Sequence, residues 1–402
     1  MKKTIALTFG TRLLASFLGM GTGILIARLL GPTGRGEYFL AITVIGMALQ
    51  FGALGLHSSN VYQVAANHDL FPRLAANSLL ISLFIGVTAF PVLLLTLPLL
   101  FASVDLFMAG LIALAVGPSL YYLLMSNLLL GVDKVRQFNG LELLSRLFPL
   151  IFIGGFVIFL DLTARMAVLA SVSGLLASVL VMAYFALPKQ RPKMDWPLFK
   201  GAISYGSRAY LAAILGFMLS RAGGLLLGLQ DKVNDMGQLS VALQLADFMI
   251  MLPATVGLIL FPKLVGKTEG RGQLTFNVVK ILAGLMTIGC VMAWLLADFL
   301  IPLVFGQDFR GSVSVFRYML PGIFALSLIS VVSQYLAAYG IPWALIASWL
   351  VGLILMLGVS WLLIPTHSAN AVAIAMSVSY GAVGVLLCFL AIHKNSLTSI
   401  QP

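Results

Sequence analysis

Charge is what this sequence has least of. Only 9% of its 402 residues are Asp, Glu, Lys or Arg, whereas soluble proteins carry about 25%. Two cysteines and four histidines, without any cluster at metal-ligand spacing, exclude a structural zinc site and a disulfide framework. The glycine-rich GPTGRG at Gly31 lacks the Lys-Ser/Thr of a nucleotide-binding loop, which excludes an ATPase of that type. No loop is long enough to house a Ser-His-Asp constellation.

Long apolar runs fill almost all of the remaining sequence. Hydrophobic residues make up 60% of the chain, and a run of about 20 is enough to cross a bilayer. Backbone polar groups must be paired inside hydrocarbon, so these runs are predicted to be helices. The prediction is an all-α integral membrane protein with twelve spans, at 8–30, 38–65, 76–100, 106–130, 138–160, 164–187, 199–228, 236–264, 273–301, 311–338, 342–364 and 369–392.

Loop charges predict the orientation of the spans. With the N-terminus inside, thirteen Lys and Arg residues fall on the inner side and four on the outer side: Arg35, Arg165, Lys232 and Arg310. This bias predicts cytoplasmic N- and C-termini. It also explains the net charge of +11 by the membrane, so no nucleic-acid partner is expected. The first apolar run contains Arg12 and is not followed by a small-x-small cleavage site, so it is interpreted as an uncleaved span.

The two halves of the chain resemble each other. GTRLLASF near the start matches GSRAYLAA at Gly206, and LLGPTGRGEYFLAI at Leu29 matches LLGLQDKVNDMGQLSVAL at Leu226. Two further pairs follow in the same order, beginning at Ser126 and Ser333 and at Ala164 and Ala369. Six spans per half predict a parallel repeat about an axis along the membrane normal, with a central cleft. The expected domains are lobes at 1–190 and 199–402, joined by a cytoplasmic linker at 191–198.

Most deep charges in the spans are arginines. The set is Arg12, Arg146, Arg208 and Arg221 against Glu142 and Asp247. A charge inside a membrane helix usually faces a partner or a water-filled cavity, so this excess predicts an interior that holds an anion. A guanidinium group can bind a phosphate through two parallel hydrogen bonds. We expect Arg12 and Arg208 toward the inner side of this site and Arg221 toward the outer side.

Three other positions leave alternatives open. Glu142 and Arg146 are one helical turn apart and can pair with each other, in which case Arg146 does not meet an anion. Asp247 either pairs with an arginine in a helix contact or serves as a proton or sodium site, and Glu142 is the second candidate for such coupling. His57, one heptad after Gln50 in the second predicted span, is either a packing residue or a substrate contact. No cofactor and no metal are predicted.

Three segments carry a resemblance to a known family. ILIARLLGPTGRGEYFLAI with FGALGLHSSNVYQVA, MGQLSVALQLADFMIMLPATVGLILFPKL, and YLAAYGIPWALIASWLVGLILMLGVSWLLIPTHSANAVAIAMSVSY resemble the polysaccharide-transporter, or O-antigen flippase, family. This family belongs to the multidrug/oligosaccharidyl-lipid/polysaccharide exporter superfamily. The resemblance implies two six-helix bundles around a V-shaped cleft. Arg12 and Arg28 fall where family members often have a basic residue. His57 and its neighbouring serines depart from the family's apolar or small residues.

The resemblance implies a transporter and not an enzyme. Its implied activity is flipping of undecaprenyl-diphosphate-linked oligosaccharide from the cytoplasmic to the outer leaflet of the bacterial inner membrane. Implied partners are the lipid-linked oligosaccharide, membrane lipids, and the polysaccharide polymerase and chain-length machinery. One alternative is a cation-coupled multidrug exporter of the same superfamily, whose interior should be acidic. Another is a membrane-embedded polymerase or glycosyltransferase, which would need a long polar loop that the sequence lacks.

Overall fold

Helices make up all the regular structure of the described residues. The computed structural model describes residues 2–159, 162–186, 193–266 and 270–398, and it leaves out the side chains of 2–9, 204–206 and 395–398. Ten helices in these ranges are long and apolar enough to cross a membrane, which makes this a multi-pass membrane protein. The elements are α1 (Lys2–Gly52), α2 (Leu56–Ala66), η1 (His68–Leu70), α3 (Phe71–Leu100), α4 (Leu106–Gly131), α5 (Val135–Phe159), α6 (Ala164–Ala186), α7 (Trp196–Leu229), α8 (Val233–Val265), α9 (Arg271–Phe305), η2 (Gln307–Phe309), α10 (Gly311–Ala337) and α11 (Trp343–Thr398).

The chain forms two compact units. Unit 1 is Met1–Tyr210 and holds α1 to α6 with the first part of α7; unit 2 is Leu211–Pro402 and holds the rest of α7 with α8 to α11. In unit 1, α4 packs against α1, α2, α3, α5 and α6. In unit 2, α10 packs against α8, α9 and α11. The matching segments at Ser126 and Ser333 lie in these two central helices, and each helix is followed by a left-handed residue, Asp133 or Gly340.

Polar side chains fix several helix starts. The Asp105 carboxylate accepts a hydrogen bond from the Met108 N–H, 2.9 Å away, at the start of α4. The Asp195 carboxylate accepts from the Leu198 N–H at the start of α7. Such caps satisfy N–H groups that have no partner within the helix, and each typically stabilises it by about 1 kcal/mol.

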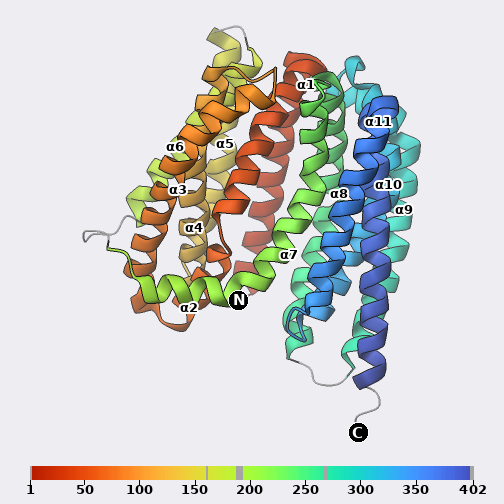
Figure 1. Cartoon of the computed structure of the whole chain (residues 1–402). Coiled ribbons are helices and arrows are strands. Elements are labelled where there is room, and N and C mark those ends of the chain that lie inside the picture. Colours follow the sequence, from red (N-terminus) through yellow and green to blue (C-terminus); the bar gives the residue numbers. More distant parts are fainter. Residues whose placement is uncertain (1, 160–161, 187–192, 267–269, 399–402) are drawn as a thin grey trace. The chain divides into compact units, whose positions relative to one another are not determined.

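Two helices are too long for one crossing. α1 has 51 residues and α11 has 56, whereas about 20 residues cross a bilayer. Each contains one residue with a non-helical backbone, Gly31 with φ 65° in α1 and Ser368 with φ 48° in α11. Pro32 follows Gly31, and its fixed φ suits the first turn of a new helix. Figure 1 shows each helix running to one end of its unit and returning, so each is a helical hairpin.

The second predicted span, 38–65, is wrong as a single helix. α1 ends at Gly52 and α2 begins at Leu56. Leu54 and Gly55 between them have φ 47° and 74°, a left-handed conformation that helices do not contain. Gln50 and His57 therefore lie on different helices and do not share the face that their heptad spacing predicted.

Small residues let the helices approach closely. A Cβ built on Gly86 of α3 would lie 2.9 Å from the Gly117 Cα of α4. A Cβ on Gly322 of α10 would lie 2.9 Å from the Ser377 Cα of α11. Close backbone contact at small residues drives helix association where no hydrophobic effect acts between helices.

We therefore expect Gly86→Val to destabilise unit 1 by about 1–3 kcal/mol, because its side chain overpacks the α3–α4 contact. The measurement is the thermal unfolding midpoint of the purified protein in detergent. Gly155→Val on α5 is the matched control, since a Cβ there meets nothing within 4 Å. Equal midpoints for the two variants would contradict this packing.

Candidate functional site

One face of α1 organises the cations of unit 1. Arg12, Ser16, Gly19 and Gly23 follow helical spacing along it. Gly19 has no side chain, so Arg146 of α5 reaches α1 here: its Cδ is 4.0 Å from the place of a Gly19 Cβ. One turn further on, the Gly23 carbonyl accepts a hydrogen bond from the Arg35 guanidinium. Arg146 and Arg35 thus both reach the predicted small-residue face of α1.

Glu142 and Arg146 do not form an ion pair, which was one of the two alternatives that their spacing left open. Four ion pairs with N···O distances up to 4.0 Å occur in the described part of the chain, and neither residue belongs to one. The reason is the direction of Arg146, which extends across to Gly19 of α1. Its side chain is exposed, while Glu142 is half-buried. Arg146 is therefore not neutralised by contact with Glu142.

Arg35 is a functional candidate that sequence patterns did not reveal. The charge distribution places it in an outer loop, but it is 5% exposed and lies in α1 four residues after the break at Gly31. Its bond to Gly23 ties together the two halves of the α1 hairpin. Tyr38, one turn later, places its hydroxyl 3.0 Å from the Ser171 hydroxyl of α6. Hydrogen bonds therefore hold the two halves of α1 together and join α1 to α6 near the break at Gly31.

Lys232 is the counterpart of Arg35 in unit 2. Its Nζ donates to the Ile364 carbonyl at 3.0 Å and to the Ser368 hydroxyl at 2.8 Å, at the break in the α11 hairpin. A signal for both residues is present in the repeat: Arg35 follows Gly31 of LLG by four residues, and Lys232 follows Gly228 of LLG by four. Both repeats thus use a basic residue at this position to hold a hairpin turn.

Unit 2 contains an ion pair between two of the predicted site residues. The Arg221 guanidinium of α7 and the Asp247 carboxylate of α8 are 2.5 Å apart. This is the arginine pairing that was one of the two alternatives for Asp247. The side chains are 23% and 57% exposed, respectively. Tyr380 of α11, buried at 4% exposure, lies within electrostatic range of both groups.

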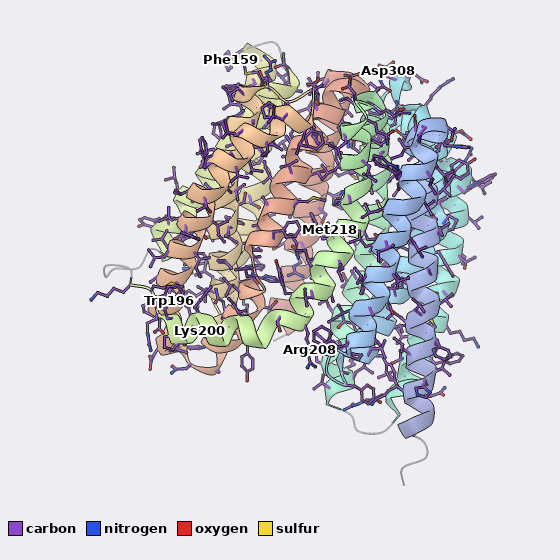
Figure 2. The ribbon with its side chains drawn as sticks, in the orientation of Figure 1. Phe159, Trp196, Lys200, Arg208, Met218 and Asp308 are labelled. Carbon is purple, nitrogen blue, oxygen red and sulfur yellow. The ribbon has the colours of Figure 1, made fainter. Side chains whose placement is uncertain are left out.

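The remaining predicted site residues, Arg12, Arg208 and His57, all belong to unit 1. Arg12 and Arg208 are exposed, and Figure 2 shows Arg208 on the first part of α7, beyond Trp196 and Lys200. His57 lies on α2, which is not among the ten candidate spans, and its Nδ1 is buried without a hydrogen-bond partner. No contact within the described residues joins His57 to the arginines of α1 and α5.

The start of α7 is fastened to α3. The Asn77 side chain donates to the Asp195 carbonyl and accepts from its N–H, at 3.0 and 2.7 Å, and Arg73 forms an ion pair with the Asp195 carboxylate. At the far end of this part, the Tyr210 hydroxyl donates to the Phe51 carbonyl at 2.9 Å. These bonds explain why residues up to Tyr210 belong to unit 1.

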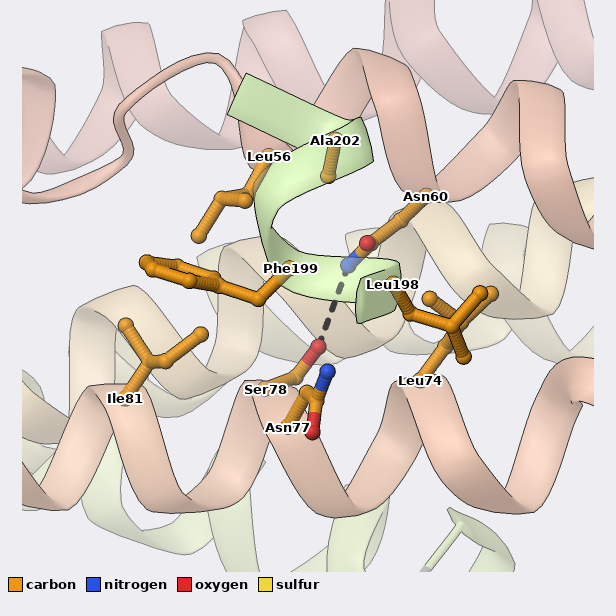
Figure 3. A pocket seen from close by; sticks show the side chains of 9 residues that line it. All are labelled: Leu56, Asn60, Leu74, Asn77, Ser78, Ile81, Leu198, Phe199 and Ala202. Atoms are coloured by element: carbon orange, nitrogen blue, oxygen red, sulfur yellow. Dashed lines mark hydrogen bonds between the residues drawn. The ribbon is translucent and has the colours of Figure 1, made fainter. Parts of the chain in front are cut away.

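A small pocket with an internal volume of about 10 Å³ lies beside this attachment. Its lining residues come from α2, α3 and α7: Leu56, Asn60, Leu74, Asn77, Ser78, Ile81, Leu198, Phe199 and Ala202. Figure 3 shows the Asn60 amide bonded to the Ser78 hydroxyl within it, at 3.1 Å. Most of the lining is apolar and its polar groups bond to one another or to Asp195, so the pocket is a packing gap and not a glycan site. In the described ranges no group of three His, Cys, Asp or Glu side chains could hold a metal ion.

Comparisons with known proteins identify the family. The family model described as "Polysaccharide biosynthesis protein" matches residues 25–314, which is well over half of the chain. No curated protein matches the sequence.

Solved structures identify the fold. The structure "Lipid II flippase MurJ, inward closed conformation" has a TM-score of 0.80 and 13% identity, covering 96% of this chain and 87% of that one. An inward-facing multidrug resistance MATE family transporter has a TM-score of 0.77 and 15% identity, covering 96% and 95%. A transporter of the multidrug/oligosaccharidyl-lipid/polysaccharide (MOP) superfamily from Pyrococcus furiosus, whose binding pocket of reverse polarity suggests a different function, has a TM-score of 0.64 and 14% identity, covering 98% and 95%. The chain therefore belongs to the polysaccharide biosynthesis protein family and has the fold of the MOP superfamily transporters.

Proposed function

We propose that this protein is a flippase for undecaprenyl-diphosphate-linked oligosaccharide, which it moves from the cytoplasmic to the outer leaflet for surface polysaccharide synthesis. Family membership supports a role in polysaccharide biosynthesis. The observation that carries the proposal is that several charged side chains within the membrane helices are not covered by the rest of the protein. Arg12 and Arg146 in unit 1 and the Arg221–Asp247 pair in unit 2 have side chains that the rest of the protein leaves partly or largely open.

Charged side chains that the protein leaves exposed must be solvated by water. Hydrocarbon cannot solvate a guanidinium group or a carboxylate, so intramembrane charges face a cavity or a partner. Both units thus present a wet surface, and cations outnumber anions on it. A diphosphate offers several acceptor oxygens to such a surface and can bind more than one guanidinium group. A cationic drug would meet repulsion there, which disfavours the multidrug exporter.

The proposed architecture follows from the hairpins. With α1 and α11 counted as two crossings each, the ten candidate spans become twelve. The proposed lobes are residues 1–190 and 199–402, each with six spans and related by a pseudo-two-fold axis along the membrane normal, with 191–198 as a cytoplasmic linker. A V-shaped cleft between the lobes would open alternately to each side. The predicted site is Arg12 and Arg208 toward the inner side, Arg221 toward the outer side, and Arg146 and His57 as further contacts.

The contact of Asp247 with Arg221 suggests how substrate binding is linked to ion uptake. The Asp247 carboxylate binds the Arg221 guanidinium, and a diphosphate would compete with it for the same guanidinium. A carboxylate released in this way can take up a proton or a sodium ion, so Asp247 is the proposed coupling residue. Glu142 is the second proposed coupling residue, because it is a half-buried carboxylate within a membrane helix, one turn before Arg146.

The proposed location is the bacterial inner membrane with both termini in the cytoplasm, next to the polymerase and chain-length machinery. Cysteine labelling at position 193 and position 398 should then report the cytoplasmic side for both, because each lobe crosses the membrane an even number of times. Impermeant maleimide applied to intact cells is the measurement. Labelling of only one position from outside would contradict the six-span lobes, and labelling of both from outside would contradict the orientation.

The function is tested by reconstitution. Purified protein in liposomes that contain a fluorescent undecaprenyl-diphosphate oligosaccharide should move the lipid between leaflets, measured by the fraction accessible to an enzyme that cleaves the glycan outside. The control is the same vesicle with a fluorescent cationic drug inside. Drug efflux without movement of the lipid would replace the flippase by the multidrug exporter.

A further inference from the structure

Three helix ends of unit 2 meet at one aromatic ring. Arg271 begins α9, Tyr339 follows α10, and Lys394 lies near the end of α11. The Arg271 guanidinium carbon is 5.0 Å from the centroid of the Tyr339 ring, and the Lys394 Nζ is 5.4 Å from it. Both distances are within the range of a cation–π contact. One ring therefore gathers two cations that come from two different helices.

Unit 1 forms the corresponding contact with a single cation. Lys134, just after α4, has its Nζ 5.6 Å from the ring of Phe71, the first residue of α3. In both units the contact joins the start of one helix to the end of the next, α3 to α4 in unit 1 and α9 to α10 in unit 2. The ring lies at the start of α3 in unit 1 but after the end of α10 in unit 2, and the cation lies at the other helix end in each case. In unit 1 a single cation, Lys134, makes the contact between the start of α3 and the end of α4. Unit 2 differs from unit 1 in having a second cation, Lys394, at the same ring.

The surroundings of the ring favour an anion. Gly270, with φ 70°, is the N-cap of α9 and has no side chain that could accept from the first-turn N–H groups. The start of this 35-residue helix is thus the positive end of its dipole. Tyr335 is 2% exposed, and its ring centroid is 5.3 Å from that of Tyr339. Backbone N–H donors of the first turn of α9 thus lie beside Arg271, which begins this helix.

We propose that Arg271, Tyr339 and Lys394 bind the phosphate of a membrane phospholipid head group. A phosphate has enough acceptor oxygens to bridge a guanidinium fork and an ammonium group at the same time. The site lies at the ends of membrane helices, where head groups are found. Apolar side chains run from it along the helices toward the hydrocarbon, among them Phe276 at 62% and Ile392 at 70% exposure. This site is distinct from the site for the transported diphosphate and does not depend on the proposed function.

The experiment measures phospholipid retained by the purified protein. Native mass spectrometry of protein from nanodiscs of phosphatidylglycerol in phosphatidylcholine should show one retained phosphatidylglycerol, and Lys394→Gln should weaken its binding about tenfold. Arg271→Gln should weaken it at least as much. Tyr339→Phe keeps the ring and the fold but loses the hydroxyl, and it should have a smaller effect. Inorganic phosphate at millimolar concentration should not displace the lipid, which separates a lipid head group from free phosphate as the ligand.

Two matched controls distinguish the loss of this site from the loss of any one positive charge. Lys280→Gln removes one positive charge from α9 at an exposed position nine residues after Arg271, and it should leave retention unchanged. Lys134→Gln breaks the single-cation contact of unit 1 and should also leave retention unchanged. Equal retention in wild type, Lys394→Gln and Arg271→Gln would overturn the proposal. Retention of phosphatidylglycerol by Glu269→Gln but not by wild type would also overturn it, because the two cations would then bind the carboxylate of Glu269 in the wild-type protein. Glu269 lies outside the described residues.

Discussion

Replacing Arg12 with alanine is expected to abolish transport of the lipid-linked oligosaccharide. Arg12 is exposed on the face of α1 that also carries Gly19 and Gly23, where Arg146 and Arg35 reach the helix. Two charge-assisted hydrogen bonds to a phosphate are together worth about 3–6 kcal/mol. Their loss should reduce transport roughly a hundredfold or more. Movement of the fluorescent lipid in proteoliposomes is the measurement.

Two further variants make this result specific. Arg12→Lys keeps the charge but not the guanidinium fork, so it should restore transport only in part. Arg310→Ala is the matched control, because this arginine bonds to Gln307 in the turn before α10 and belongs to no predicted site; its transport should equal that of wild type. Arg208→Ala should resemble Arg12→Ala, because the similar segments GTRLLASF and GSRAYLAA place the two arginines at matching positions. Full transport by Arg12→Ala at normal protein levels would remove Arg12 from the site.

Replacing Asp247 with asparagine is expected to tighten substrate binding while costing little stability. The Arg221–Asp247 contact is 2.5 Å, but the Asp247 side chain is 57% exposed. Solvent screens a pair of this kind, so its loss should lower the free energy of unfolding by about 1 kcal/mol or less. A diphosphate no longer has to displace the carboxylate from Arg221, and its affinity should rise about tenfold. Titration of the purified variant with undecaprenyl diphosphate measures the change.

The same variant tests coupling. An asparagine amide does not titrate and carries no charge, so any dependence of transport on pH or sodium that acts through Asp247 should disappear. Arg221→Gln should weaken binding, and the double variant should bind like Arg221→Gln, because the carboxylate acts only through this arginine. If Asp247→Asn leaves affinity, ion dependence and stability unchanged, Asp247 has neither role. If it mainly unfolds the protein, the pair is a helix contact and not a substrate switch.

Much of the architecture could be predicted from the sequence because the constraints are local. A run of about 20 apolar residues must be helical in a bilayer, whatever its neighbours are. Multiple membrane crossings and the family could therefore be predicted from composition and motifs. The small-residue face of α1 was also predictable, since helical periodicity alone aligns Arg12, Gly19 and Gly23. The helix break between Gln50 and His57 was not, because left-handed residues at Leu54 and Gly55 leave little trace in hydropathy.

The partners of the charges were decided by tertiary structure. Asp247 meets Arg221, 26 residues away, and Arg146 turns to Gly19 of another helix instead of Glu142 of its own. Arg35 looked like a loop residue, but the turn at Gly31 buries it against Gly23. Spacing along one helix says which residues share a face, whereas the rotation and depth of neighbouring helices decide what that face meets. The sequence by itself thus determined helical membrane spans and an excess of cations within them. Only the approach of Arg146 to α1 and the contact of Arg221 with Asp247 decided which of those cations are paired.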